Sequence, residues 1–272
     1  MCPTNQETDD SHSKESFLTT ILKKVNMMTT LTTKTVIVTG AYGGMGFDIA
    51  KGFLERGDNV VITGRDSEKL AQAATKLGHP DQLATVSGDI GNQQTGEQLV
   101  ATAIARFNSL DVLINNAGIF YPKAFLDSTE EDLEHFFHTN LKGTYLTSQS
   151  AARQMVKQGK GGAIINIGTV LVDHAMTGFP ASAALTSKGG VHALTVNLSA
   201  ELAPHKIRVN TVAPGVIRTP LQPENVDDYA GIHPLNRIGE VEETTEAVIH
   251  LATANFTTGV TLAVDGGYRV GR

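Results

Sequence analysis

Apolar, β-branched stretches alternate along most of this chain with segments whose apolar residues recur at helical spacing. Residues 35–40 (TVIVTG) and 59–64 (NVVITG) are apolar along nearly their whole length, and each stretch ends at a glycine. Such uninterrupted runs are typical of strands that are buried on both faces of a parallel sheet. The same pattern predicts further strands over residues 82–89, 111–118, 162–169, 207–215 and 258–267.

The helical segments lie between these strands, so that strand and helix alternate to the end of the chain. Short connections and right-handed crossovers between such units predict an α/β, doubly wound (Rossmann) fold, a seven-stranded parallel sheet with helices on both faces. We expect residues 31–272 to form a single domain of this type. The predicted helices cover residues 45–56, 67–78, 95–107, 183–205 and 241–253, and residues 129–156 contain one long helix or two.

Residues 1–30 differ from the rest and are expected to be a flexible N-terminal extension. The beginning of this extension is polar and is expected to be disordered. Residues 17–25 (FLTTILKKV) have the pattern of a short amphipathic helix. The extension is either a frayed tail or an arm that packs on a neighbouring subunit. Met27 or Met28 is an alternative start of translation.

Composition and charge argue against several kinds of function. The net charge is −6, and no basic stripe of the kind that binds nucleic acid is present. No apolar run reaches the roughly 18 residues that span a bilayer. The one cysteine, Cys2, allows no intramolecular disulfide, and no cluster of cysteine and histidine has the spacing of a metal site. We therefore expect a cytoplasmic protein without a metal ion.

The turn after the first predicted strand, TGAYGGMG, predicts a dinucleotide site. Glycine permits positive φ and a close approach of a ligand to the backbone. The start of the following helix offers unpaired N–H groups and the positive end of the helix dipole to a pyrophosphate. The residues expected to contact the cofactor here are Gly40, Tyr42, Gly44, Met45 and Gly46.

The residue after the second predicted strand indicates which dinucleotide is bound. An acidic residue there would bind the 2′-hydroxyl of the adenine ribose and select NAD. The chain has Gly64 and Arg65 instead, and a guanidinium group pairs well with a 2′-phosphate. We therefore expect NADP(H) to be preferred over NAD(H). The neighbouring Asp66 is a reason for caution, and Arg65 could instead be an ordinary surface residue.

Together these motifs resemble the short-chain dehydrogenase/reductase family, over nearly all of residues 33–268. No single motif is specific, but all of them occur in the family's order and on the expected elements. The matching segments are Thr39–Gly46 for TGxxxGxG, Asn115–Gly118 for NNAG, Asn140 within HTNLKG, Pro214-Gly215 with Thr219, and Val264–Gly267 for VDGG.

The resemblance implies further contacts to the cofactor and a mode of assembly. Members of the family usually form dimers or tetramers through the two long helices after the fourth and fifth strands, so we expect a homodimer or homotetramer. Lys188 would bind the hydroxyls of the nicotinamide ribose. The other implied contacts are Asp89 and Ile90 at the adenine, Asn116 at the adenosine ribose, and Ile217 and Thr219 at the nicotinamide.

The family's usual catalytic site combines an asparagine, a serine after the fifth strand, and Tyr-x-x-x-Lys on the next helix. The resemblance assigns Asn140 to the asparagine, Thr169 to the serine position and Lys188 to the lysine. Ala184 stands four residues before Lys188, on the same helix face, where the family has its tyrosine. The chain is thus identified as a divergent member that lacks the active-site tyrosine.

Three explanations of this difference remain open. In the first, another group carries the proton: His174, which suits general acid work near neutral pH, Ser182, which could equally cap the helix start, or water ordered by Lys188 and Thr169. In the second, the reaction does not need a tyrosine, as in family members that reduce conjugated C=C bonds. In the third, the chain is a non-catalytic NADP(H)-binding sensor or structural subunit.

The expected function is an NADP(H)-dependent oxidoreductase that transfers hydride to or from a small or medium carbonyl or conjugated C=C substrate, with a non-standard proton donor. This small-molecule substrate is expected beside the nicotinamide, at the carboxyl ends of the strands. Its walls would include residues 119–121 and the loop 170–182, with residues 221–239 as a short mobile lid. Three acids of the lid would discourage a strongly anionic substrate unless they face solvent: Glu224, Asp227 and Asp228.

Overall fold

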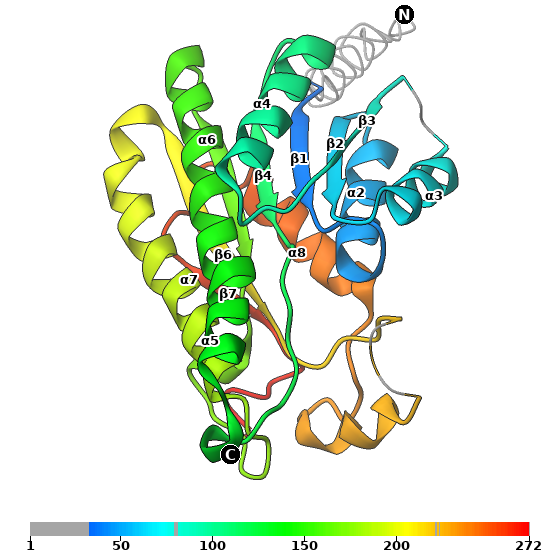
Figure 1. Cartoon of the computed structure of the whole chain (residues 1–272), viewed down its shortest axis with the longest axis vertical. Helices are drawn as coiled ribbons and strands as arrows, with labels where there is room; N and C mark the ends of the chain where they lie inside the picture. Colours follow the sequence, from blue (N-terminus) through cyan, green and yellow to red (C-terminus); the bar gives the residue numbers. More distant parts are fainter. Residues whose placement is uncertain (1–32, 79–80, 221, 223, 272) are drawn as a thin grey trace, which may run out of the picture. The chain divides into compact units, whose positions relative to one another are not determined.

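A computed structural model describes residues 33–78, 81–220, 222 and 224–271 of the chain (Figure 1). The expected N-terminal extension, with the helix predicted over residues 17–25, lies outside these residues. Residues Lys34–Arg272 group into one compact unit. Within the described ranges, no helix combines the length and the apolar character that a membrane crossing requires.

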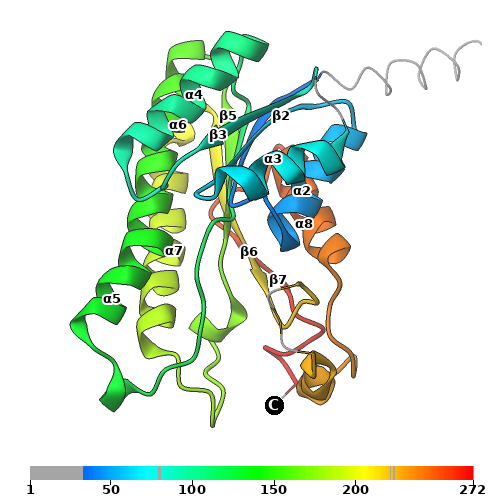
Figure 2. The ribbon, with the colours of Figure 1, turned by 45° about the vertical axis from the view of Figure 1, so that its right-hand side comes forward.

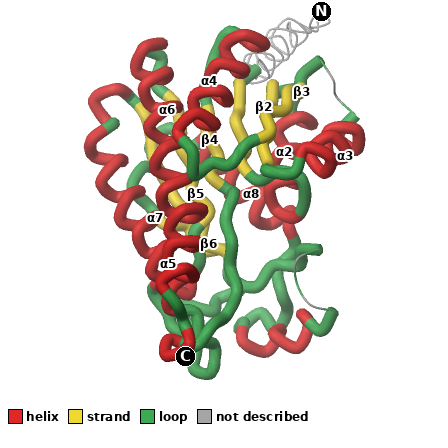
Figure 3. Tube along the Cα trace, in the orientation of Figure 1, coloured by secondary structure: helices red, strands yellow, loops and turns green. Residues whose placement is uncertain are grey.

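A parallel sheet of seven strands forms the centre of this unit, in the order β3-β2-β1-β4-β5-β6-β7. Figure 3 shows its strands in yellow and the helices around them in red. The predicted doubly wound fold is therefore confirmed. The order of the strands reverses between β1 and β4, and ligands of such sheets bind outside the carboxyl ends of the strands at this point. The strands are β1 Thr35–Thr39, β2 Asn59–Gly64, β3 Leu83–Ser87, β4 Val112–Asn115, β5 Gly162–Ile167, β6 Ile207–Pro214 and β7 Thr261–Val264.

Helices cover both faces of the sheet, as Figure 2 shows: α2, α3 and α8 lie on one face, and α4, α6 and α7 on the other. Each pair of successive strands is connected through helices, which return the chain to the edge where the next strand begins. All strands therefore end at the same edge of the sheet. The helices are α2 Gly44–Glu55, α3 Ser67–Leu77, α4 Gln93–Phe107, α5 Glu130–Phe136, α6 Gly143–Gln158, α7 Ser182–Glu201 and α8 Val241–Thr253.

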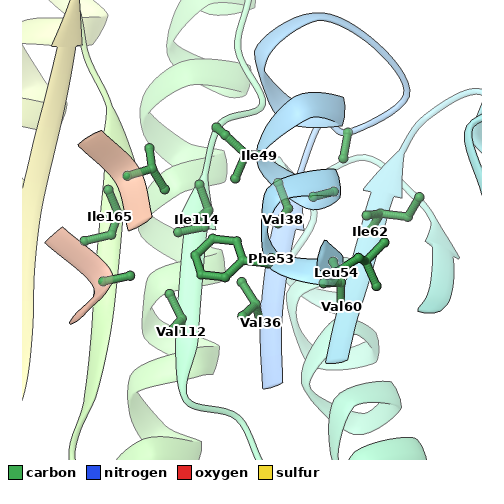
Figure 4. Close-up of a cluster of buried hydrophobic side chains, with 14 of the residues drawn as sticks. Val36, Val38, Ile49, Phe53, Leu54, Val60, Ile62, Val112, Ile114 and Ile165 are labelled. Atoms are coloured by element: carbon green, nitrogen blue, oxygen red, sulfur yellow. The ribbon is translucent and has the colours of Figure 1, made fainter. Parts of the chain in front are cut away.

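Residues of the central strands pack alternately on the two faces because side chains alternate along a strand. Val36 and Val38 of β1 pack with Phe53 of α2, in the cluster drawn in Figure 4. Ile37, between them, belongs to the cluster on the other face, together with Met155 of α6. Both faces of the sheet are thus covered by apolar side chains. This packing holds the strands in place, and the ends of these strands form the site.

Residues 129–156 form two helices, one of the two possibilities that the sequence left open. The helices α5 and α6 are joined by a π-helical turn, Phe137–Lys142. Helix α5 begins at a capping box between Thr129 and Asp132. A π-helical turn inside a helix often accompanies a functional site, and this one contains Asn140.

Strand β4 is shorter than the predicted strand over residues 111–118. It ends at Asn115, because the backbone N–H groups of Asn116 and Ala117 both donate to Oγ1 of Thr39 at 3.0 Å rather than to a neighbouring strand. The rest of the NNAG segment is therefore a loop, which crosses the carboxyl edge of the sheet beside the end of β1.

Candidate active site

The turn after β1 lies so close to the loop after β4 that two of its residues must be glycine. Gly40 has a φ of 67°, and a Cβ atom on it would lie 2.7 Å from the Cα atom of Ala117. A Cβ atom on Gly46 would overlap the side-chain amide of Asn116. Met45, between the glycines of the turn, packs on the core cluster of α2. The glycine pattern thus has a steric cause in this chain.

The side chain of Asn116 ties the two segments together. Its Nδ2 atom donates to the carbonyl oxygens of Thr39 at 2.9 Å and of Gly40 at 3.0 Å. Both amide protons of Asn116 are therefore used within the protein. A contact between Asn116 and the adenosine ribose stays a prediction, and its side-chain oxygen is the group left for it.

The start of α2 can receive an anion. Gly43, the residue before the helix, provides no side-chain cap, and the first turn contains no acidic residue, so the first N–H groups stay available. The ring of Tyr42 lies over Gly64 at the end of β2, where it excludes any larger side chain. A Cβ atom on Gly44 would lie 3.6 Å from the side chain of Thr219. The segment after β6 therefore reaches this turn.

Arg65 is exposed directly after β2, and its guanidinium group makes no hydrogen bond or ion pair to any residue that the structure describes. The acid beside it, Asp66, caps α3: its Oδ1 accepts the N–H groups of Glu68 at 3.1 Å and Lys69 at 3.0 Å. The Asp66 carboxylate also pairs with the Lys69 amine at 3.4 Å. The acid that was a reason for caution in the sequence is thus occupied by the helix start.

Asp89 follows β3 and forms a pair that the sequence analysis did not predict. Its Oδ1 accepts the N–H of Gly91 at 2.9 Å, and its Oδ2 lies 3.2 Å from Nε2 of His138 in the π-helical turn. Burial raises the pKa of the Asp89 carboxyl, but the bond from Gly91 and the pair with His138 outweigh it and lower the pKa. The next residue, Ile90, is buried against Gly143 at the start of α6. The expected adenine side of the site is thus joined to the turn that carries Asn140.

Ile217 and Thr219 lie in the segment after β6. Ile217 is buried and packs over Gly239, with which it forms an isolated parallel bridge. The N–H of Gly239 donates to the carbonyl of Val216 at 2.9 Å, and the N–H of Arg218 donates to the carbonyl of Gly239 at 2.8 Å. These bonds fix the backbone of the expected nicotinamide segment.

Asn140 and Lys188 converge on Gly118, the last residue of the NNAG loop. A Cβ atom on Gly118 would lie 3.0 Å from Oδ1 of Asn140 and 3.1 Å from Nζ of Lys188. Asn140 donates from Nδ2 to the carbonyl of Ile119 at 3.0 Å and to Oγ of Ser187 at 2.9 Å, and its Oδ1 accepts the N–H of Ile119 at 2.8 Å. Two catalytic residues expected from the resemblance are therefore brought together.

Lys188 is a buried amine without a carboxylate beside it. Its Nζ donates to the carbonyl oxygen of Ile167, at the end of β5, at 2.8 Å. Burial lowers the pKa of Lys188 to about 8, because a charged group is less stable away from water. The amine can therefore lose or gain a proton near neutral pH, a property that enzymes use in acid–base work.

The other three candidate catalytic residues do not converge on Gly118 as Asn140 and Lys188 do. Thr169 follows β5, and its hydroxyl accepts the N–H of Leu171 at 3.3 Å. His174 is exposed in the loop after it. Ser182 is the first residue of α7 and does not cap it, because the capping position belongs to Ala181. Of these side chains, Thr169 alone directly follows a central strand at the carboxyl edge of the sheet.

Ala184 is covered by aromatic side chains. It is 1% exposed and belongs to a cluster with Phe136, on which Ile119, Tyr121 and Phe179 pack. The rings of Tyr121 and Phe136 have their centroids 4.5 Å apart. Apolar and aromatic side chains thus surround Ala184, and Tyr121 brings a phenol ring into this cluster.

The expected lid contains a short 3-10 helix, Val226–Ile232, and an ion pair fixes its start. Arg218 donates from Nη2 to Oδ1 of Asp227 at 2.6 Å and from Nε to Oε1 of Glu240 at 3.1 Å. Arg218 thus offsets part of the charge of Asp227, and the expectation that the acids of the lid discourage an anionic substrate stays a prediction.

Two histidines near the site escaped the sequence analysis. His138 lies two residues before Asn140, and His192 lies four residues after Lys188 on the same face of α7. The Nε2 atom of His192 is buried beside Gly168 without a hydrogen-bond partner among the described residues, and burial lowers the pKa of the ring. Spacing relative to Asn140 and Lys188 was the one signal that could have identified them.

A sequence profile of the family described as short chain dehydrogenase matches residues 34–230. The chain belongs to the short-chain dehydrogenase/reductase family. It is 36% identical over 250 residues to an L-rhamnose 1-dehydrogenase (NAD(P)(+)) of Sphingomonas sp. (strain SKA58), covering 87% of this chain and 96% of the relative. It is 33% identical over 249 residues to an NADP-dependent (R)-specific alcohol dehydrogenase of Lentilactobacillus kefiri, covering 86% of this chain and 96% of the relative.

Solved structures agree with this assignment. A short-chain type dehydrogenase/reductase from Mycobacterium marinum superposes with a TM-score of 0.81 at 34% sequence identity, over 87% of this chain and 96% of that one. This short-chain dehydrogenase/reductase is thus an oxidoreductase that works with a nicotinamide cofactor.

A tyrosine placed at residue 184 of this short-chain dehydrogenase/reductase is expected to destabilise it. Because Ala184 is buried under Phe136 and Tyr121, the larger ring forces these side chains apart, which costs about 1–3 kcal/mol of the free energy of unfolding. Urea unfolding of Ala184→Tyr measures this cost. Ala71→Tyr, at an exposed position of α3, is the control. Unchanged stability of Ala184→Tyr would show that the space is open.

Proposed function

We propose that this oxidoreductase uses NADP(H) in preference to NAD(H) and transfers hydride to or from a small or medium carbonyl or conjugated C=C substrate. The proton comes from a group other than a tyrosine at position 184. The observation that carries the proposal is the convergence of Asn140 and Lys188 on Gly118, beside the glycine turn. An ionisable amine and a dinucleotide-binding turn thus meet at one edge of the sheet.

The residues around the glycine turn fit NADP(H). The uncapped start of α2 suits the pyrophosphate. The guanidinium group of Arg65 makes no hydrogen bond or ion pair within the described chain, whereas the carboxylate of Asp66 caps α3. A guanidinium rather than a carboxylate is therefore available to the adenine ribose. The relative from Lentilactobacillus kefiri is named as NADP-dependent, which agrees with this preference.

When bound, the cofactor supplies or accepts the hydride, and this chain supplies the groups that handle the proton. Lys188 has three N–H donors, of which one is used by Ile167. The other two are available to the ribose hydroxyls and to a water molecule shared with the hydroxyl of Thr169. In reduction this water donates a proton to the substrate, and the Lys188 ammonium group donates a proton to the water in turn. Neither His174 nor Ser182 is needed in this scheme.

The substrate is proposed to be mostly apolar. The segment after Gly118 and the loop before α7 face each other through aromatic rings, and those of Phe120 and Phe179 are stacked with centroids 6.1 Å apart. Such walls favour apolar groups with few polar contacts. Asp227 is paired with Arg218, which also pairs with Glu240, so these three side chains keep one net negative charge.

Replacing Arg65 with alanine is expected to weaken NADPH binding by about 10- to 100-fold, since a guanidinium–phosphate pair is a charge-assisted contact. NADH lacks the 2′-phosphate, so its affinity should stay the same. Titration calorimetry with both dinucleotides on Arg65→Ala measures the difference, and Arg106→Ala, on α4, controls for the loss of one positive charge. An equal loss for NADH and NADPH would contradict the preference.

Lys188 is expected to set the pH dependence of reduction. With a pKa of about 8, the amine is charged below this pH and neutral above it, so the rate at saturating NADPH should be level below about pH 8 and fall above it. Lys188→Met should lower turnover by more than about 100-fold. The free energy of unfolding of Lys188→Met at pH 7 should be about 1–3 kcal/mol higher than that of wild type, because the substitution removes a buried, unpaired charge.

Turnover of a panel of ketones and enones decides between this proposal and a non-catalytic role. An NADP(H)-binding sensor or structural subunit would bind NADPH and convert none of them. Consumption of NADPH with any substrate of the panel, lost in Lys188→Met, supports the enzyme. A pH profile that is the same in both proteins would exclude Lys188 as the proton source.

We also propose that the protein forms a homodimer or homotetramer through α6 and α7. A groove of about 350 Å³ between these helices is lined by apolar and charged side chains, including Tyr145, Arg153 and Val156. The small residues Ser187 and Gly190 do not serve this surface, because they pack inside the chain against Asn140 and Leu141.

Val156→Glu is expected to lower the mass of the assembly by placing a charge in this contact. Light scattering after size-exclusion chromatography measures the mass. Leu126→Glu, in the exposed segment before α5, is the matched control and should leave the mass unchanged. A wild-type protein that is monomeric, or an assembly that Val156→Glu leaves intact, would contradict an interface through α6 and α7.

A further inference from the structure

His233 connects the end of the lid segment to the turn after β6. It follows the 3-10 helix Val226–Ile232 and is 3% exposed. Its Nε2 atom accepts the backbone N–H of Val216 at 3.3 Å. A Cβ atom on Gly215 would lie 2.9 Å from the same Nε2 atom. The imidazole therefore presses directly on the backbone that leads to Ile217 and Thr219, the segment expected at the nicotinamide.

The bond to Val216 requires a neutral imidazole. Because Nε2 accepts a proton from a backbone N–H, it has no proton of its own, and the ring proton is on Nδ1. Nδ1 is buried and lacks a hydrogen-bond partner among the described residues, although the carbonyl groups of Tyr229 and Ala230 act on it. A second proton on the ring would turn Nε2 into a donor that faces another donor, and the bond would be lost.

The surroundings of His233 favour this neutral form. Burial lowers the pKa of the ring, and it outweighs the opposing effects of the Ala230 carbonyl and of Asp265 at the end of β7. Tyr268, after β7, packs edge-on against the imidazole with centroids 6.3 Å apart. Two further charged groups line the small cavity beside the ring, Arg237 and Glu243.

These surrounding charges are already paired. Arg237 and Glu243 bind each other at 2.6 Å, and Asp265 accepts the N–H groups of Gly267 and Arg269, each at 3.0 Å. None of them forms a hydrogen bond to the imidazole. The cavity has a volume of about 50 Å³, enough for a water molecule.

We propose that His233 is a positioning residue: while neutral, it holds the turn Gly215–Thr219 in the conformation that binds the nicotinamide half of the cofactor. The inference rests on the proposed function for the identity of the ligand, but the fixing of the turn does not depend on it. At neutral pH the bond to Val216 is made. As the pH falls through the ring's lowered pKa, the bond is lost and the turn loosens.

Two substitutions separate the hydrogen bond from the titration. His233→Gln keeps an acceptor that can reach the Val216 N–H but does not titrate. His233→Leu fills the space but accepts no hydrogen bond. We expect the NADPH dissociation constant at about pH 7.5 to rise about three- to tenfold in His233→Leu and to change little in His233→Gln, as for the loss of one hydrogen bond.

The pH dependence of NADPH affinity gives the second readout. Between about pH 7.5 and pH 5, wild-type affinity should fall about three- to tenfold more than that of His233→Gln. Adenosine 2′,5′-bisphosphate, which carries only the adenosine half, is the matched control ligand. Its affinity changes with pH through the ionisation of its own phosphate groups, and this change should be the same in all three proteins. An NADPH affinity that falls equally with pH in wild type and in His233→Gln would overturn the proposal.

Hydrogen exchange of the cofactor-free protein tests the fixing of the turn by itself. The peptide covering Gly215–Thr219 should exchange faster in His233→Leu than in wild type at the same pH, and His233→Gln should restore protection. If wild type binds neither NADPH nor NADH, the proposed function fails. Hydrogen exchange of the cofactor-free protein still tests whether His233 fixes the turn. Equal exchange in His233→Leu and wild type would overturn the positioning role even if NADPH binds.

Discussion

The hydrogen bonds from Asn116 to the backbone of Thr39 and Gly40 are the interaction on which the whole site depends. They join the carboxyl ends of β1 and β4, where the strand order reverses and a cleft would otherwise open. Gly40 and Gly46 are compatible with them because neither has a Cβ atom. The same loop continues to Gly118, beside which Asn140 and Lys188 lie.

A row of buried polar side chains extends this arrangement across the sheet. Asn115 donates to Oδ1 of Asn166 on β5 at 2.8 Å, Asn166 donates to Thr195 of α7 at 2.8 Å, and Thr195 pairs with Thr211 of β6 at 2.8 Å. Buried polar groups that are fully paired specify one packing. This row therefore fixes the register of α7, the helix that carries Lys188, against the strands.

The site contains groups whose burial is unfavourable for stability. Lys188 has no carboxylate partner, and the Nε2 atom of His192 and the Nδ1 atom of His233 lack hydrogen bonds within the described chain. Their burial lowers the pKa of each. Natural proteins commonly keep such unfavourable burial at functional sites, where stability and activity conflict. Position 184 is an alanine, and Lys188 is the buried amine beside Gly118 at the end of the NNAG loop.

The sequence by itself determined the fold class and the elements, because uninterrupted apolar strands and glycine turns are local patterns. It also pointed to Asn140 and Lys188 as candidate site residues, whose roles stay a prediction, and it has an alanine at position 184. It could not show that Ala184 is sealed under aromatic rings, nor that His138 and His233 bind groups far away in the chain. Such contacts join segments that only the packing of helices on the sheet brings together, and no local pattern encodes them.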